Sequence, residues 1–140
     1  MIDAAFVLSP ARDTIAVDLW EGNLPNLPGR AIKVEPRRWW LLDGAELAEV
    51  REVIADRGAA APIGGGLVRA TITGPGWRDL LSVSGFLDTE MLRAGDVAST
   101  VIHHVAVRVL VTDDAACEVF FAASYAGTLD ELWQRAAKGG

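Results

Sequence analysis

Cysteine is nearly absent from this sequence, because Cys117 is the one cysteine in 140 residues. A lone thiol forms no disulfide within the chain, which excludes the class of disulfide-stapled secreted domains and fits a reducing compartment. Residues 1–13 lack the basic segment and long apolar run of a signal peptide. No apolar run approaches the roughly 18 residues that a membrane-spanning helix needs. We therefore expect a soluble, cytoplasmic protein without membrane contact.

Positive charge is also scarce, since 13 lysine and arginine residues face 19 aspartate and glutamate residues and the net charge is −6. Nucleic-acid binding needs a basic face that displaces phosphate counterions, so this balance argues against DNA or RNA as a partner. Hydrophobic residues make up 51% of the chain and charged residues 23%, which is typical of a folded globular protein. We expect a single domain over residues 1–140, with residues 1–13 as a loosely held end.

Familiar catalytic motifs are missing as well. No Gly-x-Ser-x-Gly nucleophile elbow surrounds any serine. The glycines at 64–66 precede a strand instead of joining a strand to a helix, so they do not form a phosphate loop. The acidic pairs Asp113-Asp114 and Asp130-Glu131 fall in a predicted turn and at a predicted helix start, where carboxylates have ordinary structural roles. The residues alone indicate no catalytic site and no metal site.

The chain is organised around residues 64–85, where a strand runs into a short helix. Alternation of apolar and polar residues predicts a strand over Leu67–Thr73. Pro75 suits the first turn of the helix that follows. Residues spaced i, i+3 and i+4 give this helix one buried face, which consists of Trp77, Leu80 and Leu81.

The remaining elements follow from the same two periodicities. Strands are predicted over Thr14–Trp20, Ala31–Val34, Arg38–Leu42 and Cys117–Ala123. Helices are predicted to begin at Asp43 and at Thr128, where capping-box spacing precedes an apolar stripe. Residues 59–66 are expected to form a loop of small residues.

The longest strand pattern runs over Asp96–Thr112. Strands usually span about 3 to 10 residues, so we expect a bend or tight turn near His103-His104. Asp113-Asp114 then turns the chain into a partner strand, which makes an antiparallel hairpin. Single helices combined with such a hairpin predict an α+β fold, with an antiparallel sheet and helices packed on one face in a ferredoxin-like manner.

His103 and His104 are the first candidates for chemistry. Adjacent residues of a strand face opposite sides, so both imidazoles reach one metal only if the backbone bends. Zinc would need further ligands at defined spacing, and the sequence places none. A structural role and a role as ligand or proton-transfer group both stay open for this pair.

Five tryptophans give an indication of a partner. Trp39 and Trp40 are adjacent in one strand and must point to opposite faces, so one core does not easily take both, and Trp20 adds to the excess. Aromatic residues beside arginines, here Arg37 and Arg38, are typical of interface hot spots. A single core that absorbs most of these rings is the other interpretation. The three tryptophans are therefore the candidate partner interface.

Short motifs follow one another in order along residues 29–137. They are Gly29-Arg30-Ala31-Ile32, Pro36, Trp40-Leu41-Leu42, Thr73-Gly74-Pro75, Arg78-Asp79-Leu80-Leu81, Leu87-Asp88, Gly95, Thr100, His104–Val111, Ser124-Tyr125-Ala126 and Leu132-Trp133. In order and spacing they resemble the gamma subunit of heterotetrameric sarcosine oxidase. Two positions depart from that family, which usually has Gly-Cys-Pro-Leu-Asp-Leu where this chain runs from Gly85 to Thr89, and a phenylalanine where it has Tyr125.

The resemblance implies a fold related to the folate-binding domain of glycine-cleavage aminomethyltransferases. It implies a small subunit that has no catalytic residue and no cofactor of its own and packs against larger alpha and beta oxidase subunits. In such complexes those subunits hold FMN, FAD, NAD and tetrahydrofolate, and they oxidise the N-methyl group of sarcosine or a related secondary amine. A homo-oligomer of the isolated chain is an alternative way to cover the same surface.

A second hypothesis is a stand-alone domain that binds a folate-like or other small ligand. It predicts a pocket with convergent polar groups, into which Arg69, Arg108 or His104 would reach. The subunit hypothesis predicts instead a flat, apolar exposed patch near the candidate tryptophans. An enzyme that acts alone is the least favoured of the three.

Overall fold

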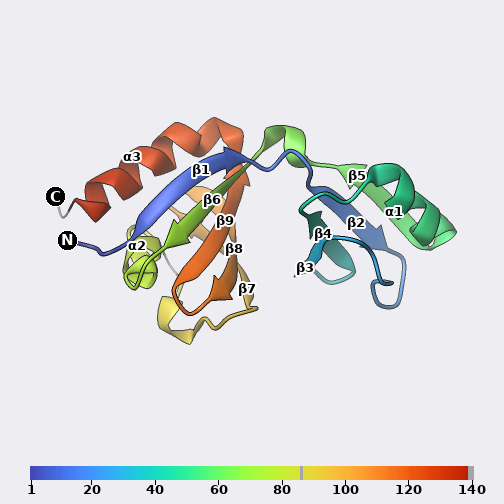
Figure 1. The fold of residues 1–140 in the computed structure, drawn as a ribbon, viewed down its shortest axis with the longest axis horizontal. Coiled ribbons are helices and arrows are strands. Elements are labelled where there is room, and N and C mark those ends of the chain that lie inside the picture. Colours follow the sequence, from blue (N-terminus) through green and yellow to red (C-terminus); the bar gives the residue numbers. More distant parts are fainter. Residues whose placement is uncertain (86, 139–140) are drawn as a thin grey trace. The chain divides into compact units, whose positions relative to one another are not determined.

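The structure, a computed structural model, describes residues 1–85 and 87–138 of the chain, and within them it has nine strands and three α-helices (Figure 1). The strands are β1 Ala5–Pro10, β2 Ile15–Leu19, β3 Arg30–Glu35, β4 Arg38–Leu42, β5 Gly58–Pro62, β6 Leu67–Thr73, β7 Val97–Ile102, β8 Val105–Asp113 and β9 Ala116–Ala122. The helices are α1 Leu47–Ile54, α2 Trp77–Ser82 and α3 Ala126–Ala137. The chain forms two compact units, of which unit 1 comprises residues 1–10 and 68–140 and unit 2 comprises residues 11–67.

Unit 1 contains a five-stranded sheet in the order β1-β6-β9-β8-β7. Helices α2 and α3 cover one face of this sheet, because their apolar residues share a core with alternate residues of the strands. Trp133 of α3 is fully buried in that core and makes edge-to-face contacts with Phe6 and Phe121, at ring-centroid distances of 5.7 and 6.2 Å. Unit 1 therefore has the sheet and helix layer that the sequence predicts.

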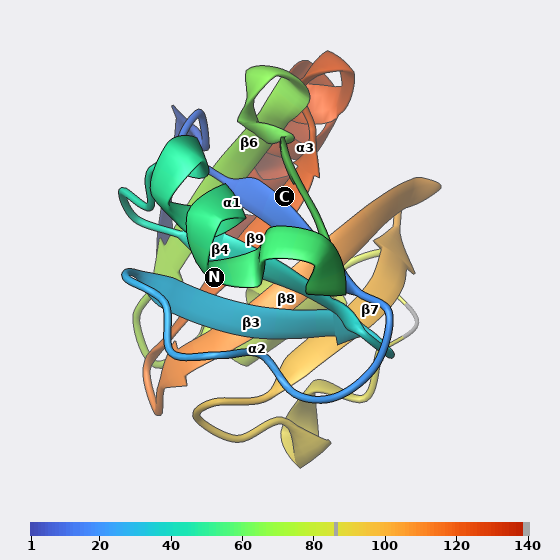
Figure 2. The same ribbon diagram turned by 90° about the vertical axis from the view of Figure 1, so that its right-hand side faces the viewer.

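Unit 2 contains a four-stranded antiparallel sheet in the order β3-β4-β2-β5. Helix α1 packs on this sheet (Figure 2) and contributes Val50 and Ile54 to a separate core. The strands supply the other members of that core, among them Val17 and Leu41, which are fully buried.

Several predictions are confirmed, beginning with the α+β fold itself. Strand β6 has the predicted bounds, and the predicted face of α2 is buried at Trp77, Leu80 and Leu81. The long alternating stretch breaks at His103-His104 into β7 and β8, which pair as a hairpin. Both histidines take positive φ, 48° and 67°, as the central residues of a tight hairpin turn do.

Other predictions are corrected. Residues 1–13 do not form a loosely held end, since they contain β1, which pairs with β6 over its whole length. Residues 59–66 include β5, whose small residues give no alternating pattern by which a strand could be identified. The described residues form two sheets, where the sequence pattern predicts one. That residues 1–140 behave as one domain stays a prediction.

The helix starts are also corrected. Asp43 has a φ of 65° and lies in a turn, so α1 begins four residues later, at Leu47, without a side-chain cap. Helix α3 begins at Ala126, before Thr128, and also without a side-chain cap. At both helix starts the chain enters the helix from a main-chain turn, without the capping side chain that the sequence pattern predicts. Phe86, which takes part in one departure from the sarcosine oxidase family, lies outside the described residues. Among the described residues, no helix is long and apolar enough to cross a membrane.

Candidate protein-protein interface

The three candidate tryptophans lie in different environments. Trp39 is 8% exposed and belongs to the core of unit 2, with the ammonium group of Lys33 5.5 Å from its ring centroid. Trp40 is half-buried. Trp20, immediately after β2, is 58% exposed. The candidate interface therefore has Trp20 as its open aromatic ring, while Trp39 serves the core.

Trp20 is exposed but held in place at three atoms. Its indole Nε1–H donates to the main-chain oxygen of Asp56 at 3.0 Å. Its main-chain N–H donates to the oxygen of Arg57 at 2.9 Å, and its own main-chain oxygen accepts from Nη1 of Arg37 at 2.8 Å. An anchored aromatic side chain loses little conformational entropy when a partner binds, which favours association. This arrangement suits a hot-spot residue.

The anchoring follows from the sheet of unit 2. Strand β2 lies between β4 and β5, so the residue that follows β2 is flanked by the turn before β4 and by the segment before β5. Arg37 comes from the first of these and Arg57 from the second. Trp20 thus extends the β2–β5 ladder by one step, with its ring beyond the end of the strand.

A hollow of about 700 Å³ opens beside Trp20. We call it the Trp20 patch, and it is lined by Trp20, Glu21, Gly22, Asn23, Asp56 and Arg57. The volume lies within the range of ligand-sized cavities, roughly 300–1,000 Å³. The flat, apolar patch that the subunit hypothesis predicts is therefore not what lies beside Trp20, and the residues that the ligand hypothesis places in a pocket, Arg69, Arg108 and His104, do not line this hollow. The lining residues come from two segments of unit 2 that are far apart in the sequence, so the patch exists only in the folded unit.

Backbone strain lies on both sides of the Trp20 patch. Arg37 has a φ of 61° in the turn between β3 and β4, where glycine or asparagine is usual. Ala55 has φ 51° and ψ −123°, values that glycine normally takes in a type II′ turn. Each such residue costs about 1–3 kcal/mol, and strained residues of this kind gather at functional sites. These two turns fix the main chain on both sides of Trp20, and positive φ also occurs at Asp43, Ser84, His103 and His104, so the anchored ring is what marks this patch as the candidate site.

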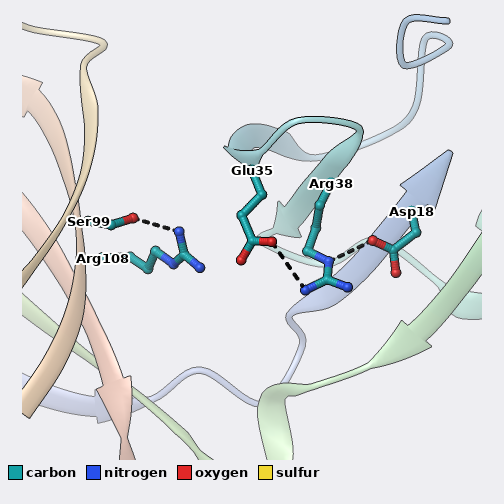
Figure 3. Close-up of polar contacts among 5 residues, drawn as sticks. All are labelled: Asp18, Glu35, Arg38, Ser99 and Arg108. Carbon is teal, nitrogen blue, oxygen red and sulfur yellow. Dashed lines mark hydrogen bonds and ion pairs between the residues drawn. The ribbon is translucent and has the colours of Figure 1, made fainter. Parts of the chain in front are cut away.

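The arginines near Trp20 have distinct tasks. Arg57 donates to the oxygens of Val53 and Ile54 at 2.6 and 3.3 Å, which satisfies the carboxyl end of α1. Arg38 bonds Asp18 at 2.6 Å and lies 3.6 Å from Glu35 (Figure 3). The hydrogen bond that Arg38 donates to Asp18, followed by the charges of Asp18 and Glu35, raises the pKa of Arg38 above its ordinary value. Arg38 is therefore occupied within the sheet, and Arg37 is the one that holds Trp20.

His103 and His104 lie at the exposed tip of the β7–β8 hairpin, with ring centroids 5.9 Å apart. The main-chain N–H of His103 donates to the oxygen of Ser84 at 3.0 Å. His103 also lines a hollow of about 190 Å³ together with residues of α3 that include Glu131 and Arg135. Among the described residues, no group of three His, Cys, Asp or Glu side chains is arranged to hold a metal ion. The turn conformation is thus the role that the structure shows for this pair.

Arg69 and Arg108 lie on the sheet face opposite α2 and α3, because their sequence neighbours point into the core. Arg69 of β6 lies 3.4 Å from the carboxylate of Glu118 and 5.4 Å from the ring centroid of Phe120. Arg108 of β8 donates to Oγ of Ser99 at 2.6 Å (Figure 3). Strand β9 separates the two arginines, and His104 lies at the hairpin tip. Arg69 and Arg108 therefore lie on either side of Phe120, which Arg108 faces in the β8–β9 register, while His104 is apart from them in the hairpin turn.

Comparisons with known protein families and with curated proteins find no match for this chain. Among solved structures, the chain is similar to a chain of heterotetrameric sarcosine oxidase from Corynebacterium sp. U-96, determined in complex with pyrrole 2-carboxylate. The TM-score is 0.69 at 12% sequence identity, and the similarity covers 95% of this chain and 84% of that chain. At this identity, the likeness shows that the two chains share a fold.

Proposed function

We propose that this chain is a small subunit of a heteromeric flavin-dependent oxidoreductase that acts on sarcosine or a related N-methyl amino acid. The observation that carries the proposal is the fold shared with a chain of heterotetrameric sarcosine oxidase, over 95% of this chain and 84% of that one. Such coverage relates nearly complete chains, not one common motif. The sequence resemblance over residues 29–137 points independently to the gamma subunit of the same type of enzyme.

In this proposal the chain supports assembly and carries neither catalytic residues nor a cofactor of its own. FMN, FAD, NAD and tetrahydrofolate would belong to larger alpha and beta subunits, which would also determine the substrate. The chemistry of the described residues is consistent with such a role. Cys117, the one thiol, is fully buried, and burial is the main reason that its pKa is raised to about 12, which makes it a poor nucleophile at neutral pH.

The Trp20 patch is the surface through which we propose that the chain contacts a larger subunit. A fixed, exposed indole beside a hollow is the arrangement that hot spots require, with an anchor that is ordered before binding. A self-associated form of the isolated chain would use the same patch when the larger subunits are missing. Binding of the subunits and self-association are therefore expected to exclude each other.

Co-purification from the native host tests this proposal. The tagged chain should bring down two large chains, identified by mass spectrometry, together with the yellow absorbance of flavin. Recovery of the 14.9 kDa chain alone and colourless, from cells that contain the oxidase subunits, would contradict the proposal. Trp20→Ala provides a matched sample in which capture should be reduced, and Met91→Ala, at a residue that is 71% exposed, provides a control in which capture should not change.

A further inference from the structure

We infer that the Trp20 patch binds an arginine side chain of a partner chain, with the guanidinium stacked on the indole of Trp20. This inference rests on the proposed function, since it names the chemistry of the segment that a partner subunit would present. It follows from three properties of the patch: an open ring face, acidic residues around it and a hollow beside it.

The first property is the ring itself. Its edge is fixed by the hydrogen bond from Nε1 to the oxygen of Asp56, and the side chain remains 58% exposed. Tryptophan is the best aromatic partner for a cation, and a guanidinium is planar and weakly hydrated, so it stacks on an indole more readily than an ammonium group does. An exposed indole whose own N–H is already bonded offers mainly this face for recognition.

The second property is charge. Glu21 and Asp56 both line the hollow, and the whole chain carries a net charge of −6. Arg57 is the one cation among the lining residues, and its guanidinium is turned to the carbonyl oxygens of Val53 and Ile54 at the end of α1. Arg37, whose Nη1 bonds the main-chain oxygen of Trp20, is a second cation close to the ring. Within the described part of the chain, both guanidinium groups donate to main-chain oxygens and neither pairs with Glu21 or Asp56, so these two carboxylates are available to an arriving cation.

The third property is space. A hollow of about 700 Å³ next to the ring holds a long side chain together with part of the main chain that carries it. Asn23 adds an amide to the lining, which can donate to main-chain oxygens and accept from N–H groups of such a segment. An arginine-bearing segment thus matches the patch in shape, charge and hydrogen-bonding capacity.

Nuclear magnetic resonance of the ¹⁵N-labelled full-length chain tests the inference. The indole N–H signal of Trp20 is identified as the one that disappears in Trp20→Phe. Blocked tripeptides Gly-X-Gly, with arginine, lysine, leucine or glutamate at X, are then added. The arginine peptide should move the Trp20 signal to saturation with a dissociation constant of the order of millimolar, as expected for one exposed cation–π contact and two weak charge pairs. Lysine should bind more weakly, and added salt should weaken both.

Charge variants sharpen the test. Glu21→Gln combined with Asp56→Asn should raise the dissociation constant of the arginine peptide by about two- to fivefold for each charge removed. Glu49→Gln makes the same change of charge on an exposed position of α1 away from the patch, and it should leave binding unchanged. An arginine peptide that moves no Trp20 signal, or a leucine or glutamate peptide that binds as well as arginine, would overturn the inference.

The outcome separates this inference from the proposed function. If flavin-containing chains co-purify but the arginine peptide does not bind, the inference fails and the proposed function stands. If the peptide binds as described but no large chains co-purify, the cation site stands and the proposed function fails.

Discussion

The indole Nε1 of Trp20 donates a hydrogen bond to the main-chain oxygen of Asp56, 36 positions away in the sequence. This bond joins the end of β2 to the strained segment that precedes β5. It fixes a side chain that solvent would otherwise leave free to rotate. The bond is thus important for presenting the ring and of minor importance for the stability of the unit.

Replacement of Trp20 by alanine should therefore separate assembly from stability. The free energy of unfolding should fall by no more than about 1 kcal/mol, because an exposed side chain loses one solvent-accessible hydrogen bond. The affinity for the proposed partner subunits should fall by about 2 kcal/mol or more, as for a hot spot. Urea unfolding and partner capture measure the two quantities. Equal losses in both would show that Trp20 acts through the fold.

Ala55→Gly should stabilise the protein, because glycine takes the backbone conformation with φ 51° and ψ −123° without strain. The expected gain is about 1 kcal/mol in the free energy of unfolding. The control is Ala59→Gly in β5, where glycine only adds freedom to the unfolded chain and should cost about 0.5–1 kcal/mol. A shift of the urea midpoint in the same direction for both variants would contradict the assignment of strain to Ala55.

His103→Asn combined with His104→Gly should also raise the urea midpoint. A two-residue hairpin turn with positive φ at both positions prefers Asn-Gly, and the two histidines adopt φ values of 48° and 67°. A gain of about 1 kcal/mol or more is expected. If stability falls instead, the imidazoles make a contribution to unit 1 beyond their place in the turn.

Gly58→Ala should be among the most destabilising single substitutions in unit 2. A Cβ at Gly58 would lie 2.0 Å from the main-chain oxygen of Asp18 in the neighbouring strand β2. The clash is with backbone, so the two strands must separate, at an expected cost of about 2–4 kcal/mol. Gly65→Ala is the matched control, because no atom lies within 4 Å of its added Cβ and it should change stability by less than about 0.5 kcal/mol.

Cys117 should react very slowly with thiol reagents in the folded protein. Burial raises its pKa from 9.0 to about 12, with a further contribution from the charge of Glu118. At pH 8 the thiolate fraction should be about a thousandfold lower in the folded than in the unfolded chain. Because the folded pKa lies above the unfolded value, stability linked to this group is complete below pH 9 and is lost as the pH rises toward 12. Comparison of thiol-labelling rates with and without urea gives the ratio, and similar rates would contradict it.

Elements with a strong period were predictable from the sequence. In strand β6 and in helix α2, the residues that face the core are apolar and recur with the period of a strand or a helix. This spacing was enough to predict both elements. Strand β5 was missed, because a run of glycine and alanine residues carries no alternation. The helix predicted at Asp43 begins later, because capping-box spacing also occurs in turns. The positive φ of Asp43 shows that a turn forms at this position.

The candidate site could be predicted only in part. An excess of tryptophan pointed to Trp20, but its neighbours Asp56 and Arg57 come from a segment about 36 residues later, for which the sequence predicted no contact with Trp20. Their position beside Trp20 depends on the pairing of β2 with β5, which no local pattern reports. Trp39 and Trp40 are adjacent in one strand and face opposite sides, so the sequence could not show which of the two faces a core. The structure places Trp39 in the core of unit 2.

The register of β1 with β6 places Pro10 directly opposite Val68. Just beyond this pair, the main-chain N–H of Ala11 donates to the oxygen of Leu67 at 3.0 Å. The chain thus passes from unit 1 into unit 2 after Pro10 and returns to unit 1 at Val68. Unit 2 is an insertion between two strands, β1 and β6, that pair as an antiparallel hairpin would. Genes of such architecture can gain, lose or exchange the inserted module while the host sheet keeps its strand order. The residues that line the Trp20 patch all belong to that module, so substitutions among them leave the core of unit 1 unchanged.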